Sequence, residues 1–347
     1  MELNNSVDQM LNEYRARLHW DRRDYKAALD HATIAADEAL GKEDVTGYWR
    51  MTFLLAECQL ELGMVQEFAA SAKDLAENPA VQGDRVLVKR AKVLHSRALE
   101  ALGHTGESLV VAMEAAAIDV SGLVDKVEEV EMLHGLVAAL AESSREQEAW
   151  TYALKMAELA GDVDNQRVAG KAYWAVGNVA FLNEDPENGI YYHALAAENL
   201  APGNDVNTWA FFNKGSAHAR LIAGVVDEET LACIERAELA NSVTGGSPIL
   251  ELEIATARAH WLVLSGAASE AAEITLEILA HQELLPEHTL AEVEYVSSLA
   301  LHELGRNDEA LIAAAHAEKV FIGHGSQRRA LEARNLIKSI TGASATA

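Results

Sequence analysis

The sequence predicts an all-α protein built as an array of about eight helix pairs. A position mostly occupied by small residues recurs along the chain with steps of 39 to 41 residues. Each recurrence follows an amphipathic segment and a short break, and it opens a second amphipathic segment. Only five prolines and 6% aromatic residues suit helix packing and argue against a proline-punctuated all-β fold. The recurring positions are Ala28, Phe68, Ser108, Ala149, Gly189, Thr230, Ala271 and Ala310.

Helix ends follow from the residues at the breaks. Glycines such as Gly63 and Gly103 can end a helix in a left-handed conformation, and Asp, Ser or Asn can cap the next one. Longer polar linkers separate one pair from the next. We expect a single domain, 1–347, with repeats at 6–40, 45–77, 84–119, 124–160, 164–200, 205–241, 248–282 and 287–321, and a capping helix at 326–340 that covers the last repeat.

The fifth repeat carries a recognisable motif. An aromatic residue, an aliphatic residue and a glycine occur at fixed spacing in its first helix, and small residues follow in its second. With these residues the chain resembles the tetratricopeptide repeat (TPR). They are Tyr173, Val176, Gly177, Ala180, Gly189, His193, Ala196 and Pro202. The period of about 40 residues exceeds the usual 34 and also occurs in HEAT and armadillo arrays. The step between small residues and the turn before it favour the TPR-like alternative.

The resemblance implies a right-handed α–α superhelix, a TPR-like solenoid, whose first helices line a concave groove. Longer variants of this repeat recur in bacterial cytoplasmic regulators, where the array follows a DNA-binding helix-turn-helix. The resemblance therefore also implies a helix-turn-helix encoded upstream or in a separate chain.

Composition excludes several other functions. The formal net charge of −26 disfavours direct binding of nucleic acid by this chain, because nucleic acid is a dense polyanion. Cys58 and Cys233 lie far apart in apolar stretches, which predicts buried thiols rather than a disulfide or a metal pair. No signal peptide and no membrane-spanning run is present in the sequence, so we expect a cytoplasmic protein that does not bind membranes.

Catalytic motifs are absent from the sequence. It contains no metalloprotease, CxxC, P-loop or nucleophile-elbow motif. The histidines are scattered and fit core or groove positions better than metal ligands. We therefore expect no enzymatic activity, no metal site and no cofactor.

The repeat register predicts which side chains line the groove. In repeat five an inner stripe has spacings of three and four residues, and repeat six continues it. Asparagine can donate to and accept from the backbone of an extended peptide, and aromatic rings can provide pockets. The alternative for the aromatics is packing between neighbouring repeats. The predicted groove residues are Lys171, Trp174, Asn178, Phe181, Trp209, Phe212, Asn213, Ser216, Arg220, Arg90 and Arg97.

The sequence thus favours a peptide- or protein-binding module, the ligand-sensing or protein-interaction part of a bacterial transcription regulator. The alternative is an assembly scaffold or chaperone-like adaptor, and an enzyme is the least favoured. The expected partner is a protein or peptide in the groove. The oligomeric state is left open, with a homodimer among the alternatives.

Overall fold

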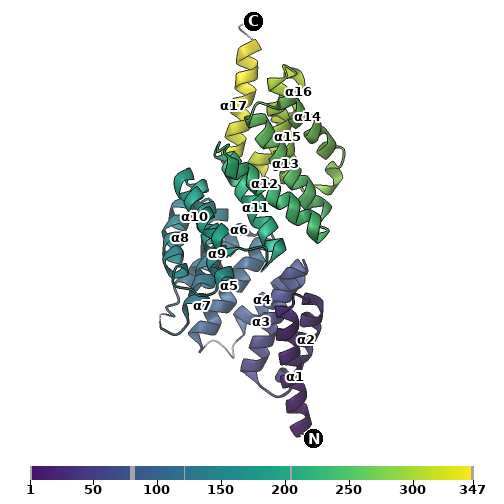
Figure 1. The fold of residues 1–347 in the computed structure, drawn as a ribbon. Helices are drawn as coiled ribbons and strands as arrows, with labels where there is room; N and C mark the ends of the chain where they lie inside the picture. The colour runs from purple at the N-terminus through teal and green to yellow at the C-terminus, as the bar shows by residue number, and fades with distance from the viewer. Residues whose placement is uncertain (1, 79–82, 121, 204, 345–347) are drawn as a thin grey trace. The chain divides into compact units, whose positions relative to one another are not determined.

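The computed structural model describes residues 2–78, 83–120, 122–203 and 205–344, and these are arranged in helices throughout (Figure 1). The predicted all-α fold of helix pairs is confirmed. The chain divides into two compact units, Met1–Asn183 and Glu184–Ala347, called unit 1 and unit 2 below. The single domain and the exact repeat boundaries stay predictions.

Unit 1 contains four helix pairs and the first helix of the fifth. The pairs are α1 (Glu2–Asp21) with α2 (Tyr25–Gly41), α3 (Val45–Glu61) with α4 (Val65–Glu77), α5 (Arg85–Ala101) with α6 (Thr105–Ala116), and α7 (Lys126–Glu142) with α8 (Glu146–Ala160), followed by α9 (Gln166–Leu182).

Unit 2 begins with the second helix of the fifth pair. Its elements are α10 (Pro186–Asn199), α11 (Val206–Ile222), α12 (Glu228–Thr244), α13 (Pro248–Leu264), α14 (Ala268–Leu279), a short 3₁₀ turn (Gln282–Leu284), α15 (Glu287–Glu303), α16 (Asn307–Gly323) and α17 (Gln327–Ser344).

Short polar side chains start many of these helices. Asp44 accepts a hydrogen bond from the backbone N–H of Gly47, and Asp125 accepts one from Glu128. Such bonds satisfy amides that the first helical turn leaves unpaired. The same cap recurs at Asp24, Asp84, Asn165, Asp185, Asp205, Asp227 and Ser247.

The turn inside each helix pair has one conformation in all eight pairs. One residue in each turn has a φ between 54° and 87°, in the left-handed region. At Gly63, φ is 72°, and this conformation lets the chain reverse directly after α3. The eight residues are Arg23, Gly63, Gly103, Ser144, Glu184, Gly224, Gly266 and Gly305.

The recurring position that predicted the array is buried in every repeat. Ala28, Ala149 and Ala310 are each 0% exposed, and Phe68 is 0% exposed as well. It lies in the first turn of the second helix, where a small side chain allows the helices to approach closely. Separate apolar clusters follow one another along each unit, as expected where a repeat packs on its neighbours.

The predicted C-terminal helix is present as α17, which lies alongside α16 at the yellow end of the chain in Figure 1. Ala330, Ala333 and Ile340 of α17 pack against Ala314 and Phe321 of α16. This helix therefore covers the apolar side of the last pair. Within the described residues, no helix combines the length and apolarity that a membrane span requires.

Candidate functional site

The inner face of unit 1 holds a cavity of about 400 Å³. Its walls come from the first helices of successive pairs, α3, α5, α7 and α9, with Trp20 from α1. Apolar side chains such as Phe53 and Val130 share these walls with charged side chains of both signs. The charged residues are Glu57 and Glu61 on α3, Arg90 and Arg97 on α5, Glu128 and Glu131 on α7, and Arg167 and Lys171 on α9.

Arg90 is held in place from two sides. Its guanidinium lies 4.8 Å from the centre of the Phe53 ring and 5.5 Å from the centre of the Trp49 ring. Its Nη1 also donates to Oε1 of Glu128 at 3.0 Å. Stacking on aromatic faces combined with a carboxylate contact is a geometry that arginine adopts and lysine does not reproduce. Arg90 thereby joins α3, α5 and α7.

Arg97 is a cation of the cavity whose charge acts on Glu57 and Glu131 without direct contact. Its side chain is exposed, and among the described residues it makes no hydrogen bond or ion pair. Five N–H donors are therefore available for a carboxylate or for carbonyl oxygens. The cavity thus presents an arginine that is ready to bind an acceptor.

Three ionisable groups that line the cavity, Glu57, Glu131 and His134, have shifted pKa values. Burial raises the pKa of Glu57 from 4.5 to about 7, and the charge of Arg97 opposes this only in part. Desolvation by the surrounding protein likewise raises the pKa of Glu131, although its side chain is exposed. It lowers the pKa of His134 from 6.5 to about 4, and the neighbouring charges of Arg97 and Lys171 add to the effect. His134 is thus neutral at pH 7, whereas Glu57 is only partly ionised.

The structure places the predicted groove residues of unit 1 in two different settings. Arg90, Arg97 and Lys171 line the cavity. Trp174 and Asn178 are half-buried on α9 outside the cavity lining, and Phe181 is buried with 5% of its surface exposed. Three of the four basic residues of the cavity lining were thus among the predicted groove residues, and Arg167 was not.

The predicted residues of unit 2 lie on α11 and are mostly buried. Phe212, Asn213, Ser216 and Arg220 are at most 3% exposed, whereas Trp209 is half-buried. The amide nitrogen of Asn213 donates to the Trp209 carbonyl at 2.8 Å. This contact ties the Asn213 side chain to its own helix.

Two further contacts hold α11 to its neighbours in unit 2. The Ser216 hydroxyl lies 3.0 Å from Nδ1 of His193, and Arg220 forms an ion pair with Asp227 at 3.2 Å. Helices α9 and α11 belong to different units. A ligand-binding role for these α11 residues stays a prediction.

Several cavity residues were missing from the predicted groove. Glu57, Glu128 and Glu131 line the same cavity as Arg90 and Arg97 but were not among the predicted groove residues. The signal that could have found them is helical spacing. Glu57 is four residues after Phe53 and Glu131 three residues after Glu128, so each pair shares a helix face.

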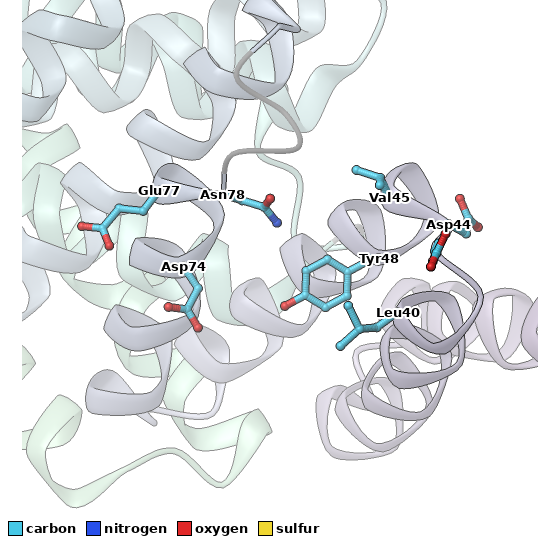
Figure 2. A pocket seen from close by; sticks show the side chains of 8 residues that line it. Leu40, Asp44, Val45, Tyr48, Asp74, Glu77 and Asn78 are labelled. Atoms are coloured by element: carbon cyan, nitrogen blue, oxygen red, sulfur yellow. The ribbon is translucent and has the colours of Figure 1, made fainter.

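A second cavity of about 430 Å³ lies between the α2–α3 turn and the C-terminal end of α4 (Figure 2). Leu40, Val45 and Tyr48 form its apolar side, and Asp74 and Glu77 project from α4. Asp44, also in its wall, already caps α3 and accepts a bond from Gln9. These two bonds lower the pKa of the Asp44 carboxyl, since they stabilise its charged form.

The helix pairs and their register define a TPR-like fold, and solved structures with this fold are similar to the chain. One is the crystal structure of a Rap protein complexed with competence and sporulation factor. It has 10% sequence identity and a TM-score of 0.62, and the match covers 100% of this chain and 99% of that chain. The apo form of RapI has 11% identity and a TM-score of 0.51, with 95% and 99% covered.

A third similar structure is BtubC from P. vanneervenii, at 15% identity and a TM-score of 0.50, with 64% of this chain and 93% of that chain covered. At these identities the likeness shows the fold alone. No protein-family model and no curated protein matches the sequence.

The described residues contain no group of three or more His, Cys, Asp or Glu side chains arranged to hold a metal ion. Both cysteines are buried free thiols, and burial raises the pKa of Cys58 to about 12 and that of Cys233 to about 11. Thiols with such pKa values stay protonated at neutral pH and are poor nucleophiles.

Proposed function

We propose that the inner face of unit 1 binds a peptide, or a peptide segment of a partner protein. We further propose that the chain is the ligand-sensing or protein-interaction part of a bacterial transcription regulator. One observation carries the proposal: a cavity across four successive first helices combines aromatic walls with an arginine that has no acceptor among the described residues.

The wall chemistry suits a peptide. Trp20 and Phe53 offer apolar surface to side chains, and Arg97 can donate to backbone carbonyls or to a carboxylate. The similar Rap structure, which is complexed with competence and sporulation factor, supports a ligand-binding role for this fold. The regulator role rests on the resemblance of the repeats to those of bacterial helix-turn-helix regulators.

The test is selection of a random displayed peptide library against the full chain. Selected peptides should bind the Arg97→Ala/Lys171→Ala double variant at least about tenfold more weakly, since each charge-assisted hydrogen bond contributes about 1.5–3 kcal/mol. Thermal stability should stay close to that of the parent, because Arg97 is exposed and Lys171 is half-buried.

Lys73→Ala is the matched control. Lys73 lies on the second helix α4 of the same unit, is 58% exposed and is outside the cavity lining, so peptide affinity should not change. If the library yields no binder while proteins co-purify with the chain, the scaffold or adaptor function is favoured. Peptides that bind the double variant and the parent equally well would place the site elsewhere.

The regulator role has its own test. The parent gene, or a gene next to it, should encode a helix-turn-helix segment, and the full regulator should change its operator affinity when a selected peptide is added. If no selected peptide changes the operator affinity, the sensing role is contradicted. The proposal that the chain binds peptides would not be affected by this result.

A further inference from the structure

The charges lining the unit 1 cavity alternate in sign from helix to helix. The charged lining residues are acidic on α3, basic on α5, acidic on α7 and basic on α9. A chain with a net charge of −26 has few bases, yet four of them lie here in two rows that alternate with two rows of carboxylates. The inner face thus carries four rows of charge in the order minus, plus, minus, plus.

Only part of this pattern is neutralised within unit 1. The Arg90–Glu128 pair, at 3.0 Å, joins the second row to the third, and both side chains are 32% exposed. Arg97 has no hydrogen-bonding or ion-pairing acceptor among the described residues, and Glu57 on the first row has a pKa of about 7. A raised carboxyl pKa means that the neighbouring cations do not offset the cost of burying the charge.

The spacing expected between such rows suits one backbone conformation. Packed helices lie about 8–10 Å apart. Helix α5 packs against α7 and α7 against α9, and Arg90 of α5 stacks on Phe53 of α3. A polyproline II helix advances about 3.1 Å per residue with three residues per turn, so side chains of one face recur every ~9 Å. In a β-strand, by contrast, residues three apart point to opposite faces.

We propose that the inner face of unit 1 binds a polyproline II segment whose charge alternates at every third residue, with basic residues opposite α3 and α7 and acidic residues opposite α5 and α9. This inference rests on the proposed function and specifies its ligand class. Two aromatic side chains lie at the α3 end of the rows, Trp20 on α1 and Phe53 on α3, and would contact the residues between the charges there, as aromatic grooves contact proline-rich segments.

The experiment compares two decapeptides of identical composition, both acetylated and amidated to remove terminal charges. The alternating peptide is KPAEPAKPAE, and the blocked peptide is KPAKPAEPAE. Binding of fluorescently labelled peptides to the full chain is measured by anisotropy at low salt. The alternating peptide should bind at least about tenfold more tightly, and its affinity should fall with added NaCl.

A charge reversal separates recognition from structural support. The Arg97→Glu variant should bind the alternating peptide about tenfold more weakly than the parent does. It should bind KPAKPAKPAE, in which lysine replaces the first glutamate, about as tightly as the parent binds the alternating peptide. A purely structural role of Arg97 gives loss without this rescue. Lys73→Glu on α4 makes the same change of charge away from the cavity and should leave both affinities unchanged.

Equal or tighter binding of the blocked peptide, or failure of the rescue, contradicts recognition of alternating charge. Whether the chain binds peptides at all is then tested by the library selection. The absence of measurable binding by either decapeptide also contradicts recognition of alternating charge. Binders from the library would in that case still support the proposed function, and their sequences would show another pattern.

Discussion

Glu57 shows how one side chain can serve a site at the expense of stability. Its carboxyl lies half-buried on α3 and has a pKa of about 7, because burial raises it more than Arg97 lowers it. Such a group is tolerated where its charge is used, as in a binding cavity. In the free protein the ionised carboxylate costs free energy.

We predict that Glu57→Gln removes a pH dependence of stability. The pKa of Glu57 in the folded protein exceeds its usual value of 4.5, so the folded state holds the proton more tightly and the parent loses stability as the pH rises from about 4.5 to 7. Allowing for solvent screening, the free energy of unfolding of the parent should fall relative to that of the variant by about 1–2 kcal/mol between pH 4.5 and 8. Urea unfolding at both pH values measures it, and parallel curves would contradict the shift.

At the residue scale, the sequence predicted the cavity only in part. Helical spacing selected Arg90, Arg97 and Lys171, which line the cavity. It also selected Trp174 and Asn178, which continue the stripe of Lys171 and lie outside the lining. The same reasoning selected Phe212 and Asn213, which are buried. One residue turns the side chain by about 100°, so the inner stripe and the packing stripe are neighbours that a degenerate motif does not separate.

At the scale of the element, a buried ion pair fixes the capping helix α17 to the pair before it. The Arg329 side chain is 8% exposed and donates to the carboxylates of Glu292 on α15 and Glu332 on its own helix. Its guanidinium also lies 4.4 Å from the centre of the Tyr295 ring. Apolar periodicity predicted the helix, but the sequence alone did not show that Arg329 is buried.

We predict that Arg329→Ala lowers the free energy of unfolding of unit 2 by about 3–5 kcal/mol, since it leaves two carboxylates that have lost their buried cation. Arg334→Ala on the same helix is the control. Its partner Glu318 lies 2.7 Å away, but Arg334 is 48% exposed, so the cost should be below about 1 kcal/mol. Hydrogen exchange of α15 and α17 amides measures the stability loss of each variant. Similar losses in the two variants would show that burial of the ion pair does not determine its contribution.

At the scale of the whole molecule, charge decides which macromolecules can approach. The net charge of −26 gives long-range repulsion from nucleic acid, and the described bases are largely spread among acidic neighbours. The helix-pair fold was predictable in full because the 40-residue step repeats along the whole chain, whereas the division into two units has no counterpart in the repeat pattern.

We predict no measurable binding of a 30-base-pair random duplex by this chain at 150 mM salt in an anisotropy titration up to about 10 µM protein, because binding would bring two polyanions together. Poly-lysine of similar length should bind under the same conditions, and its affinity should fall as salt is raised. Salt-sensitive submicromolar binding of the duplex would show that local basic rows outweigh the net charge.

The left-handed turn within each helix pair has a consequence for how such arrays tolerate change. Five of the eight turns use glycine, whereas Arg23, Ser144 and Glu184 adopt the same conformation with a side chain, at a cost of about 1 kcal/mol each. Replacing these three with glycine should raise the melting temperature in steps that add, because the turns lie in separate repeats. Glycine is thus the consensus residue at this turn position within the chain itself. Repeats with glycine turns could be used to engineer a longer or more heat-resistant array.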